Sequence, residues 1–292
     1  MKSKLKIFLK NTCIFLVITL LSILLVVLVR VFFIATFKIP SYSMEPALHS
    51  GDLIVVNKLI PGPRVFTDWN FFINNNLKMK RCKGIRPLQR GEVVVFNFPK
   101  SGGDWHEIKM DFNLYYVKRV VGMPGDTLSI VDGFYRIRNS CEIVGNWRNQ
   151  FQLSNTSDSL LEFCILNTFP FNKHYSWTIK NFGPIYIPRA NECLTINVTN
   201  ILLYKEIVEY ETGKKLKVSN DIVFLGDKIL KYYRFKQNYY FMAGDQVLNS
   251  QDSRYWGLLP EDHIVGKAIC ILRSKDIITG EIRWNRMLKT IK

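Results

Sequence analysis

A long apolar run near the N-terminus constrains this chain more than any other feature. From Cys13 to Val29 no residue is charged and only Thr19 and Ser22 are polar, and after Arg30 the run continues through Phe37. As a helix, residues 13–29 span about 25 Å and residues 13–37 about 37 Å, which brackets a bilayer core of roughly 30 Å. The run therefore predicts one transmembrane helix, with Arg30 able to reach the lipid headgroups.

The residues before this run indicate its orientation. Lys2, Lys4, Lys6 and Lys10 precede it without any acidic residue, a bias that favours a cytoplasmic N-terminus and an outer location for everything after Phe37. The alternative is a cleavable signal peptide, which has the same charged start and apolar centre. We favour an uncleaved anchor, because the run is longer than usual and no A-x-A-like site follows it.

Length and charge narrow the class of protein. The chain has 292 residues, 48% of them hydrophobic, which suffices for a buried core beyond the anchor. Its formal charge of +16 is not accompanied by a helix-turn-helix, a zinc-finger spacing or an aromatic–basic RNA signature. Attraction to anionic lipid headgroups accounts for the charge, and so does a set of merely solvated lysines. We expect a lipid bilayer and no nucleic acid as a partner.

Cysteine usage gives little further information. Cys13 lies in the apolar run, and the others are widely spaced, with no C-x-x-C that would support zinc or thioredoxin-like chemistry. These others are Cys82, Cys141, Cys164, Cys193 and Cys270. Five cysteines in an exported domain leave at least one unpaired, and the pairing of the rest is open.

Beyond residue 38 the pattern is β-rich. Short apolar or aromatic runs bounded by Gly, Pro, Asn or Asp predict strands at 53–56, 93–96, 115–121, 221–225 and 239–242. Sustained helical periodicity is scarce after residue 40. We predict a mainly β fold, an antiparallel-sheet core that carries an inserted second β-rich domain and follows one transmembrane helix. The expected divisions are 1–38 for the N-terminus and anchor, 39–126 and 239–292 for the core, and 127–238 for the insertion.

Two short stretches offer a nucleophile and a base. Ser43 lies in a loop bounded by Pro40 and Pro46, whose rings restrict the backbone, so the loop is stiffened. Taken alone, such a serine is usually only a turn residue. Lys118 lies in an aromatic and aliphatic strand, on one face with Tyr116.

A lysine can act as a base only when its pKa is lowered. A free lysine is only about 0.04% neutral at pH 7, and burial among apolar side chains raises that fraction. The alternative is a lysine of an edge strand whose amine reaches solvent. A buried Lys118 would form with Ser43 a pair that cleaves amides without histidine.

A third stretch, residues 244–257, is densely polar and directly follows the strand at 239–242. It predicts a hydrogen-bonding loop in which Ser250 orients a lysine and Asp252 pairs with Arg254. A surface turn with an ordinary weak salt bridge is the alternative. Other catalytic patterns lack support, because the chain has no G-x-S-x-G, no second histidine after His106-Glu107 and no glycine-rich phosphate loop.

Together these stretches resemble the bacterial type I signal peptidases, membrane-anchored serine proteases that remove signal peptides from exported proteins. The P-S-x-S-M-x-P loop at 40–46 and the lysine stretch at 116–126 are the strongest similarities. Further matching stretches are 51–52, 91–96, 182–188, 249–257, 260–261, 265–268 and 282–286. The matches cover about half of the chain in the family's order, whereas residues 62–90 and 134–180 show little similarity.

The resemblance implies a role for each matched residue. Ser43 would be the nucleophile and Lys118 the general base, with the Ser43 backbone N–H and the Ser41 hydroxyl as the oxyanion hole. Ser250 would hold Lys118, while Asp252 and Arg254 would brace the site. Substrates would be signal peptides of exported pre-proteins with small side chains one and three residues before the cut. No metal or cofactor is implied.

The chain departs from the family in one loop. The family has G-D-N-R-[DH]-N-S where this chain has Gln246, Val247 and Leu248 between Asp245 and Asn249. The charge pairing of this loop must therefore differ, which bears on the geometry around Ser250 more than on the catalytic pair.

We expect a single-pass endopeptidase of the bacterial cytoplasmic membrane, with its catalytic domain on the outer side. A peptidase dedicated to one secretion or conjugation system is an alternative, and so is a catalytically silent binding homologue. An extended substrate would pair with a strand edge. The aromatic stretch around Phe66, Trp69, Phe71, Phe72 and Ile73 would dip into the lipid interface, or else form an interior cluster.

Overall fold

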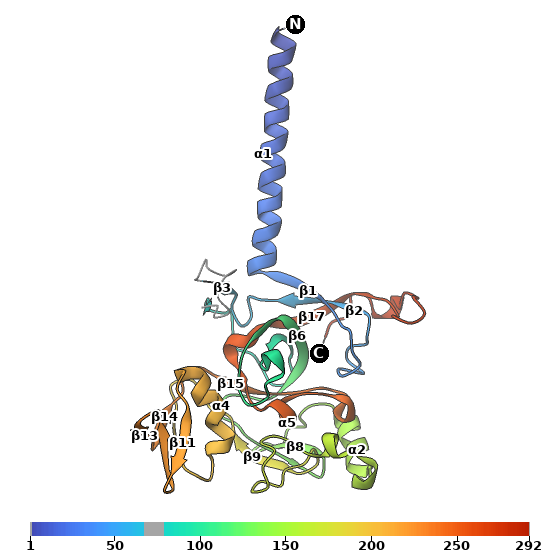
Figure 1. Cartoon of the computed structure of the whole chain (residues 1–292). Helices are drawn as coiled ribbons and strands as arrows, with labels where there is room; N and C mark the ends of the chain where they lie inside the picture. The colour runs from blue at the N-terminus through green and yellow to red at the C-terminus, as the bar shows by residue number, and fades with distance from the viewer. Residues whose placement is uncertain (1, 67–78, 292) are drawn as a thin grey trace.

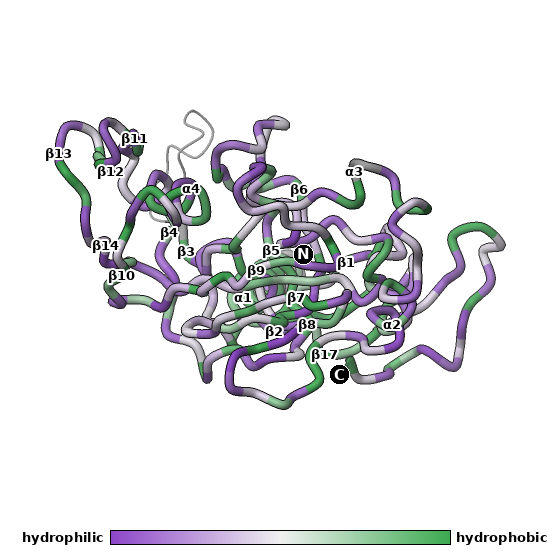
Figure 2. The backbone as a smooth tube through the Cα atoms, turned by 90° about the horizontal axis from the view of Figure 1, so that it is seen from below, coloured by the Kyte–Doolittle hydropathy of each residue, from purple (hydrophilic) through white to green (hydrophobic). Residues whose placement is uncertain are grey.

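The computed structural model describes residues 2–66 and 79–291, and it consists of a long N-terminal helix above a β-rich body (Figure 1). The helix, α1, spans Lys2–Phe32. Its stretch Phe8–Phe32 is the one helix in the described part of the chain that is long and apolar enough to cross a membrane. Seen end-on behind the body in Figure 2, the trace of this helix is green, and its apolar side chains are exposed, as expected for a helix surrounded by lipid.

The main sheet has seven antiparallel strands in the order β1-β2-β17-β5-β6-β15-β16. These strands are β1 (Ile34–Lys38), β2 (Asp52–Asn57), β5 (Val93–Phe98), β6 (Asp111–Gly122), β15 (Tyr239–Ala243), β16 (Leu259–Pro260) and β17 (Ile264–Ser274). The sheet curls strongly (Figure 1), so that Phe37 of β1 and Tyr115 of β6 approach to 5.0 Å between ring centroids. Three strands separate β1 from β6 in the sheet order.

Two open strand edges face one another because of this curl. In the described residues β1 pairs only with β2, and β15 pairs with β6 only from Arg119 to Gly122. The edge of β6 before Lys118 therefore keeps its hydrogen-bonding groups available on the side away from β5, and so does the outer edge of β1.

The core lies on both faces of β5, whose six residues are all buried. Val93 and Val95 pack in one cluster with residues of β2 and of the loop that follows β1, such as Ile54 and Met44. Val94 and Phe96 pack in another cluster with residues of β6 and β15. Since successive side chains of a strand point to opposite faces, a strand buried on both faces reads as a continuous apolar run. The sequence 93–96 has that pattern.

Residues 127–238 form smaller sheets and helices below the main sheet (Figure 1). The strands are β7 (Thr127–Val131), β8 (Phe134–Ile137), β9 (Phe182–Tyr186), β10 (Cys193–Thr195), β11 (Leu216–Ser219), β12 (Ile222–Leu225), β13 (Lys228–Ile229) and β14 (Tyr232–Arg234). The helices are α2 (Trp147–Asn155), α3 (Phe163–Leu166) and α4 (Ile201–Thr212). A large apolar cluster joins this part to the main sheet, since Val121 and Phe241 pack with Leu128, Ile185 and Val208.

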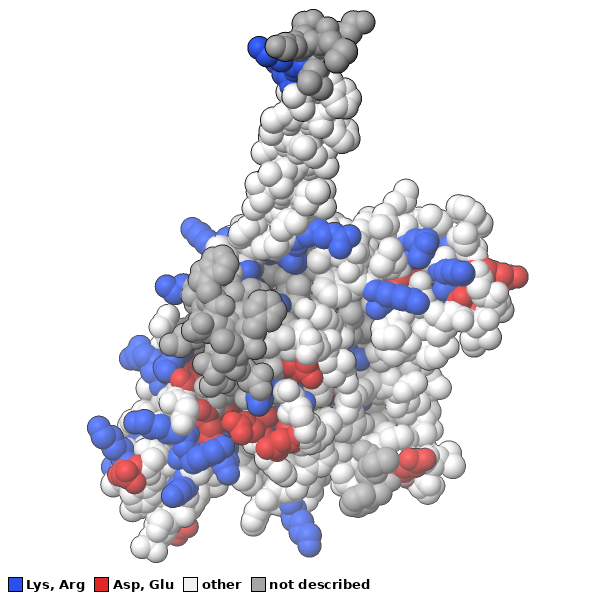
Figure 3. All heavy atoms as spheres, turned by 45° about the horizontal axis from the view of Figure 1, so that its top comes forward, with Lys and Arg blue, Asp and Glu red and all other residues white. Residues whose placement is uncertain are grey.

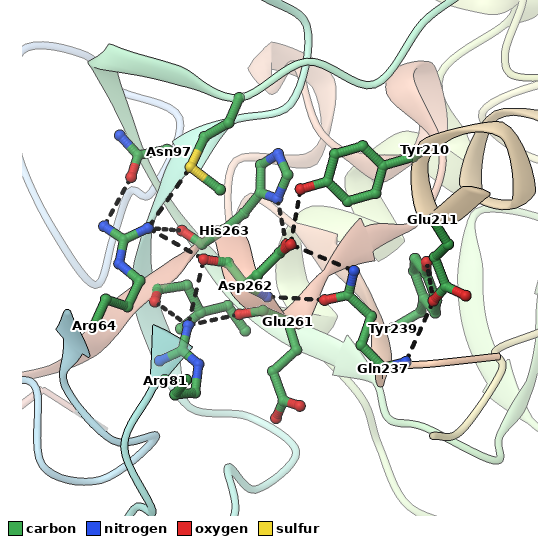
Figure 4. Close-up of polar contacts among 12 residues, drawn as sticks. Arg64, Arg81, Asn97, Tyr210, Glu211, Gln237, Tyr239, Glu261, Asp262 and His263 are labelled. Atoms are coloured by element: carbon green, nitrogen blue, oxygen red, sulfur yellow. Dashed lines mark hydrogen bonds and ion pairs between the residues drawn. The ribbon is translucent and has the colours of Figure 1, made fainter. Parts of the chain in front are cut away.

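A two-stranded ribbon, β3 (Arg64–Phe66) with β4 (Met79–Arg81), is held to the body by two arginines (Figure 4). Arg64 donates to the carbonyls of Asp262 and His263 at 3.2 and 3.3 Å, and to Asn97 Oδ1 at 2.8 Å. Arg81 donates to three further carbonyls, those of Gly62, Glu261 and Ile264. Planar guanidinium groups satisfy several carbonyls at once, so two side chains fix the ribbon against the start of β17.

The structure confirms the mainly β fold and all five predicted strands, which correspond to β2, β5, β6, β12 and β15. Helix α4 was not predicted. The predicted interfacial residues 69 and 71–73 lie outside the described residues, as does the side chain of Phe66. Of the cysteines, Cys82, Cys141, Cys193 and Cys270 are free thiols, and nothing is described of the side chain of Cys164.

Candidate active site

Ser43 projects from the loop between β1 and β2, which the core holds in place. Ile39, Met44 and Leu48 are almost fully buried in the cluster beneath the loop, whereas Ser41 is exposed. Backbone hydrogen bonds from Leu48 to Met44 and from Gly51 to Ile39 close the loop. The buried side chains thus anchor the loop on one side and leave the two serine hydroxyls on the other.

The C-terminal segment clamps the same loop. Arg286 donates to Asp52 Oδ2 at 2.7 Å and to the Ala47 carbonyl at 3.1 Å, and Arg283 donates to the Ser50 carbonyl at 3.0 Å. Burial alone would raise the pKa of Asp52, but its hydrogen bonds from Arg286 and its neighbours hold that pKa below its ordinary value. The carboxylate is therefore charged and bound at neutral pH.

Lys118 of β6 meets the Ser43 hydroxyl. Its Nζ lies 2.5 Å from Ser43 Oγ, and the residue is only 3% exposed. The amine also lies 5.7 Å from the centroid of the Tyr116 ring. This geometry excludes the alternative of an edge-strand lysine that reaches solvent.

Burial lowers the pKa of Lys118 to about 8. Asp252 and Asp245 act to raise this pKa and Arg254 acts to lower it, so desolvation is the effect that wins. With a pKa near 8, about a tenth of the amines are neutral at pH 7, roughly two hundred times the fraction of a free lysine. The pair can therefore activate a hydroxyl near neutral pH.

The two serine hydroxyls open onto a groove of about 560 Å³ between β1 and β6. Ser41 Oγ lies 3.4 Å from Ser43 Oγ. The groove is lined by 37–44 on one side, 114–118 on the other, and by Asn249 and Gln251. These walls include the two open strand edges, so an extended chain has room to lie along the hydroxyls.

The predicted pair of Asp252 and Arg254 forms and is fully buried. Both residues are 0% exposed, and Arg254 binds the two carboxylate oxygens through Nε and Nη2, each at 2.8 Å. Arg254 also donates to the Val247 carbonyl at 2.8 Å. Burial would raise the pKa of Asp252, but Arg254 holds it below its ordinary value. A buried bidentate pair differs from the weak surface salt bridge that was the alternative.

Ser250 lies beside this pair and against the Ser43 loop. Its hydroxyl donates to Asp252 Oδ2 at 2.7 Å. Within the described residues the one hydrogen bond of the Lys118 amine goes to Ser43, so the direct contact by which Ser250 was expected to hold Lys118 does not form. A Cβ on Gly244 would lie 2.1 Å from Ser250 Oγ and 2.6 Å from the Ser43 carbonyl oxygen. Only glycine fits where these two segments meet. The Gln246 N–H completes the junction by donating to the Ser43 carbonyl at 3.1 Å.

Sequence reasoning missed three residues that tie the site together. Arg119 binds Asp245 through two hydrogen bonds of 2.7 and 2.5 Å. Asn149 of α2 donates to the Asp245 carbonyl at 2.6 Å and to the Glu45 carbonyl at 3.3 Å, so it bridges the Ser43 loop and the 244–252 loop. The sequence offered a signal for the Arg119–Asp245 pair, because these two opposite charges directly follow Lys118 and Gly244. Nothing in the sequence pointed to Asn149.

The departure at 246–248 has a structural explanation. Val247 is buried in a small apolar cluster with Leu153 of α2 and Ile179, and Leu248 packs at its margin beside Ile165. Where the family has polar residues, this chain thus packs apolar ones against residues of the 127–238 segment. The loop is braced by apolar contact as well as by charge.

Replacing Asn149 tests the bridge. The Asn149→Ala variant leaves two carbonyl groups without their donor, so we expect the free energy of unfolding to fall by about 2 kcal/mol. Urea unfolding of the detergent-solubilised chain measures this change. Gln152→Ala is the matched control, because Gln152 lies on the same helix and is exposed. Equal losses in both variants would contradict the bridging role.

Replacing Lys118 tests the cost of burying its charge. The amine's pKa is lowered from 10.5 to about 8 in the fold, so keeping the amine charged lowers the free energy of unfolding by about 3 kcal/mol. This loss is complete below pH 8 and shrinks as the pH rises to 10.5. Lys118→Met removes this cost, and we expect about 2 kcal/mol more stability at pH 7, with the gain shrinking as pH rises from 8 to 10. Lys217→Met, at an exposed strand position, is the control. A Lys118→Met variant that is less stable than the parent chain at pH 7 would show that burying the charged amine has no such cost.

Within residues 2–66 and 79–291, no three His, Cys, Asp or Glu side chains are grouped so that they could hold a metal ion.

The chain is similar to proteins of one known family. The profile of the family described as signal peptidase, peptidase S26, matches residues 12–157 and 182–273. Signal peptidase I of Buchnera aphidicola subsp. Schizaphis graminum is 32% identical over 264 residues, which cover 86% of this chain and 71% of the relative. Signal peptidase I of Helicobacter pylori strain 26695 is 28% identical over 295 residues, with 92% and 89% covered.

A solved structure of signal peptidase I from Enterococcus faecalis is 17% identical, with a TM-score of 0.31, and covers 63% of this chain and 98% of that chain. This similarity is too low to bear on the argument. The family profile, by contrast, matches far more than half of the residues. The chain therefore belongs to the signal peptidase family, peptidase S26.

Proposed function

We propose that this protein is a membrane-anchored serine endopeptidase that removes N-terminal signal peptides from exported pre-proteins. The observation that carries the proposal is the buried Lys118 amine, 2.5 Å from the Ser43 hydroxyl at the side of an open groove. A neutral amine at this distance can take the proton of the hydroxyl as it attacks a carbonyl.

The reaction proceeds through an acyl-enzyme. Ser43 Oγ attacks the scissile carbonyl carbon while its proton passes to Lys118 Nζ. The oxyanion that forms accepts hydrogen bonds from the Ser43 backbone N–H and from the Ser41 hydroxyl, and each such donor is worth about 2.7–4 kcal/mol in the transition state. The C–N bond then breaks as Lys118 returns the proton to the leaving amine. Water, deprotonated by the same amine, hydrolyses the ester.

The 244–252 loop supports this pair. Asp252 acts to raise the pKa of Lys118 and Arg254 acts to lower it, so their buried pair adds little net charge near the amine. Ser250, bound to Asp252, fills the space beside the Ser43 loop. We assign to Ser250, Asp252 and Arg254 the role of holding the side chains of the catalytic pair in position.

The substrate lies along the groove as an extended strand. The open edges of β1 and β6 offer backbone hydrogen bonds on both sides, in the manner of β-augmentation. Small side chains one and three residues before the cut fit this placement, because side chains at that spacing point to the same face of a strand. Alanine at both positions is the expected preference.

The bilayer holds the enzyme through α1. The helix has the length and composition of a membrane span, and Lys and Arg side chains lie around its base on the face shown in Figure 3. Such a distribution suits contact with anionic headgroups. The lysine-rich N-terminus lies in the cytoplasm and the body lies on the outer side of the bacterial cytoplasmic membrane. We assign residues 39–126 and 239–292 to the catalytic core and 127–238 to an insertion.

The two catalytic residues are tested by substitution. A detergent-solubilised enzyme should cleave a pre-protein with an Ala-x-Ala junction, and mass spectrometry of the products should place the cut after the second alanine. We expect Ser43→Ala and Lys118→Arg to lower kcat at least 10³-fold without loss of fold, since one lacks the nucleophile and the other cannot be deprotonated. Near-normal turnover by Lys118→Arg would remove the base assignment.

The same assay separates the rival functions. Cleavage of several unrelated pre-proteins supports the proposed function, and cleavage of one dedicated substrate supports a specialised processing peptidase. A folded chain that binds pre-proteins but cleaves none of them would be the silent homologue. Exposed Gln152→Ala serves as the active control.

The pH dependence tests the state of the amine. Because Lys118 must be neutral and its pKa is about 8, we expect kcat/KM to rise with pH and to reach half of its plateau near pH 8. Stopped assays from pH 6 to 10 measure this limb. A midpoint near 10, the ordinary value for lysine, would mean that burial does not tune the amine.

A further inference from the structure

A second cavity begins where the catalytic groove ends. It has a volume of about 440 Å³ and shares two lining residues, Asn249 and Gln251, with the groove. Its other lining residues are Trp105, Ile165, Phe171, Leu248, Ser250 and Tyr255. Tyr116 Oη donates to Gln251 Oε1 at 2.8 Å, so Gln251 forms a fixed partition between the two spaces. The cavity thus borders the groove.

The walls of this cavity are mostly apolar, and contacts with neighbouring residues hold them in place. Trp105 packs against Phe98 of β5, with 6.1 Å between ring centroids. Tyr255 donates to the Ile165 carbonyl at 2.8 Å, which joins α5 (Ser253–Trp256) to α3. A preformed apolar space with a few polar groups at its entrance is typical of a site for an apolar group.

Phe171 gives a second, independent observation. Its backbone lies in the left-handed region at φ +53°, and 58% of the residue is exposed. A bulky residue in this region is strained, and such strain persists where the surrounding structure imposes it, often at binding sites. Here it leaves an aromatic ring lining an open cavity.

The chemistry of the proposed function, on which this step rests, decides which part of a substrate reaches the cavity. Lys118 returns its proton to the leaving amine, so the chain released by the cut departs on the side of that amine. Ser250 lies close to the catalytic pair, because a Cβ on Gly244 would be 2.1 Å from Ser250 Oγ and 2.6 Å from the Ser43 carbonyl oxygen. Ser250 also lines the cavity.

We propose that this cavity binds an aromatic or long aliphatic side chain from the first few residues after the cut. Recognition would then include the start of the mature protein, in addition to the small residues before the junction. The walls come from three separate segments, represented by Trp105, Phe171 and Leu248, and the segment of Phe171 lies outside residues 12–157 and 182–273, which the family profile matches. The preference is therefore expected to be a property of this chain.

A substrate series tests the proposal. The signal peptide and the Ala-x-Ala junction stay constant, while each of the first four mature positions carries Phe, Ala or Asp in turn. At one of these positions we expect kcat/KM for Phe to exceed that for Ala about tenfold, as burial of one aromatic side chain would give. Asp at the same position should be the poorest substrate. Equal values at all four positions would overturn the proposal.

Variants of the cavity locate the effect. In Phe171→Ala and in Trp105→Ala, the ratio of kcat/KM between the Phe and Ala substrates should fall to about one, and Trp105→Phe should restore most of it. Trp147→Ala is the control, since Trp147 is an exposed aromatic residue that does not line the cavity. It should keep the tenfold ratio.

The remaining outcomes are distinct. A ratio that survives in both cavity variants, or that is also lost in Trp147→Ala, would overturn the proposal. Variants that change detergent binding and leave the ratio intact would assign the cavity to a lipid chain instead. If no substrate is cleaved in a Ser43-dependent way, the proposed function itself fails. If all are cleaved equally, only this inference fails.

Discussion

Removal of one amine from water is the constraint on which the rest of the site depends. In the part of the chain that the structure describes, Lys118 has no carboxylate among its hydrogen-bond partners, and Asp252, the acid that acts most strongly on its pKa, is bound at both oxygens by Arg254. A free carboxylate at that place would hold the amine charged, because an opposite charge nearby raises a lysine pKa. The fold therefore presents the lysine with burial but without a counter-ion.

The braces around this amine differ in kind but act on the same two loops. Arg286 and the apolar cluster of Met44 fix the Ser43 loop from below, and Asn149 ties it to the 244–252 loop. In the second loop, Val247 packs where the family pattern is polar. An apolar contact of this kind needs a partner surface, and the partner, Leu153, lies in 127–238. Variation in that segment and variation in the loop are thus physically linked.

Much of this could be read from the sequence, and the reasons for the rest are specific. Runs such as 93–96 identify strands because burial on both faces requires apolar residues at every position. Helix α4 was missed because six of its twelve residues are buried, which blurs the polar face that reveals a helical period. The Asp252–Arg254 pair is local and was predicted. Asn149 was not, because each of the two loops that it bridges lies about a hundred residues away along the chain, and such a contact leaves no pattern in the sequence.

The end of α1 is tied closely to the loop that carries Ser43. Lys58 donates from its side chain to the Arg30 carbonyl at 2.7 Å and from its backbone to the Phe33 carbonyl at 2.9 Å, so the end of α1 is fixed to the end of β2. Strand β1 then runs five residues, about 17 Å, to the Ser43 loop. With α1 in a bilayer, Ser43 has little freedom to leave the membrane surface. A substrate whose own apolar segment lies in the membrane leaves that segment at the membrane surface. Only the first residues beyond the segment can therefore reach Ser43. Under the proposed function, the lengths of the anchor and of β1 would therefore determine where along its substrate the enzyme cuts.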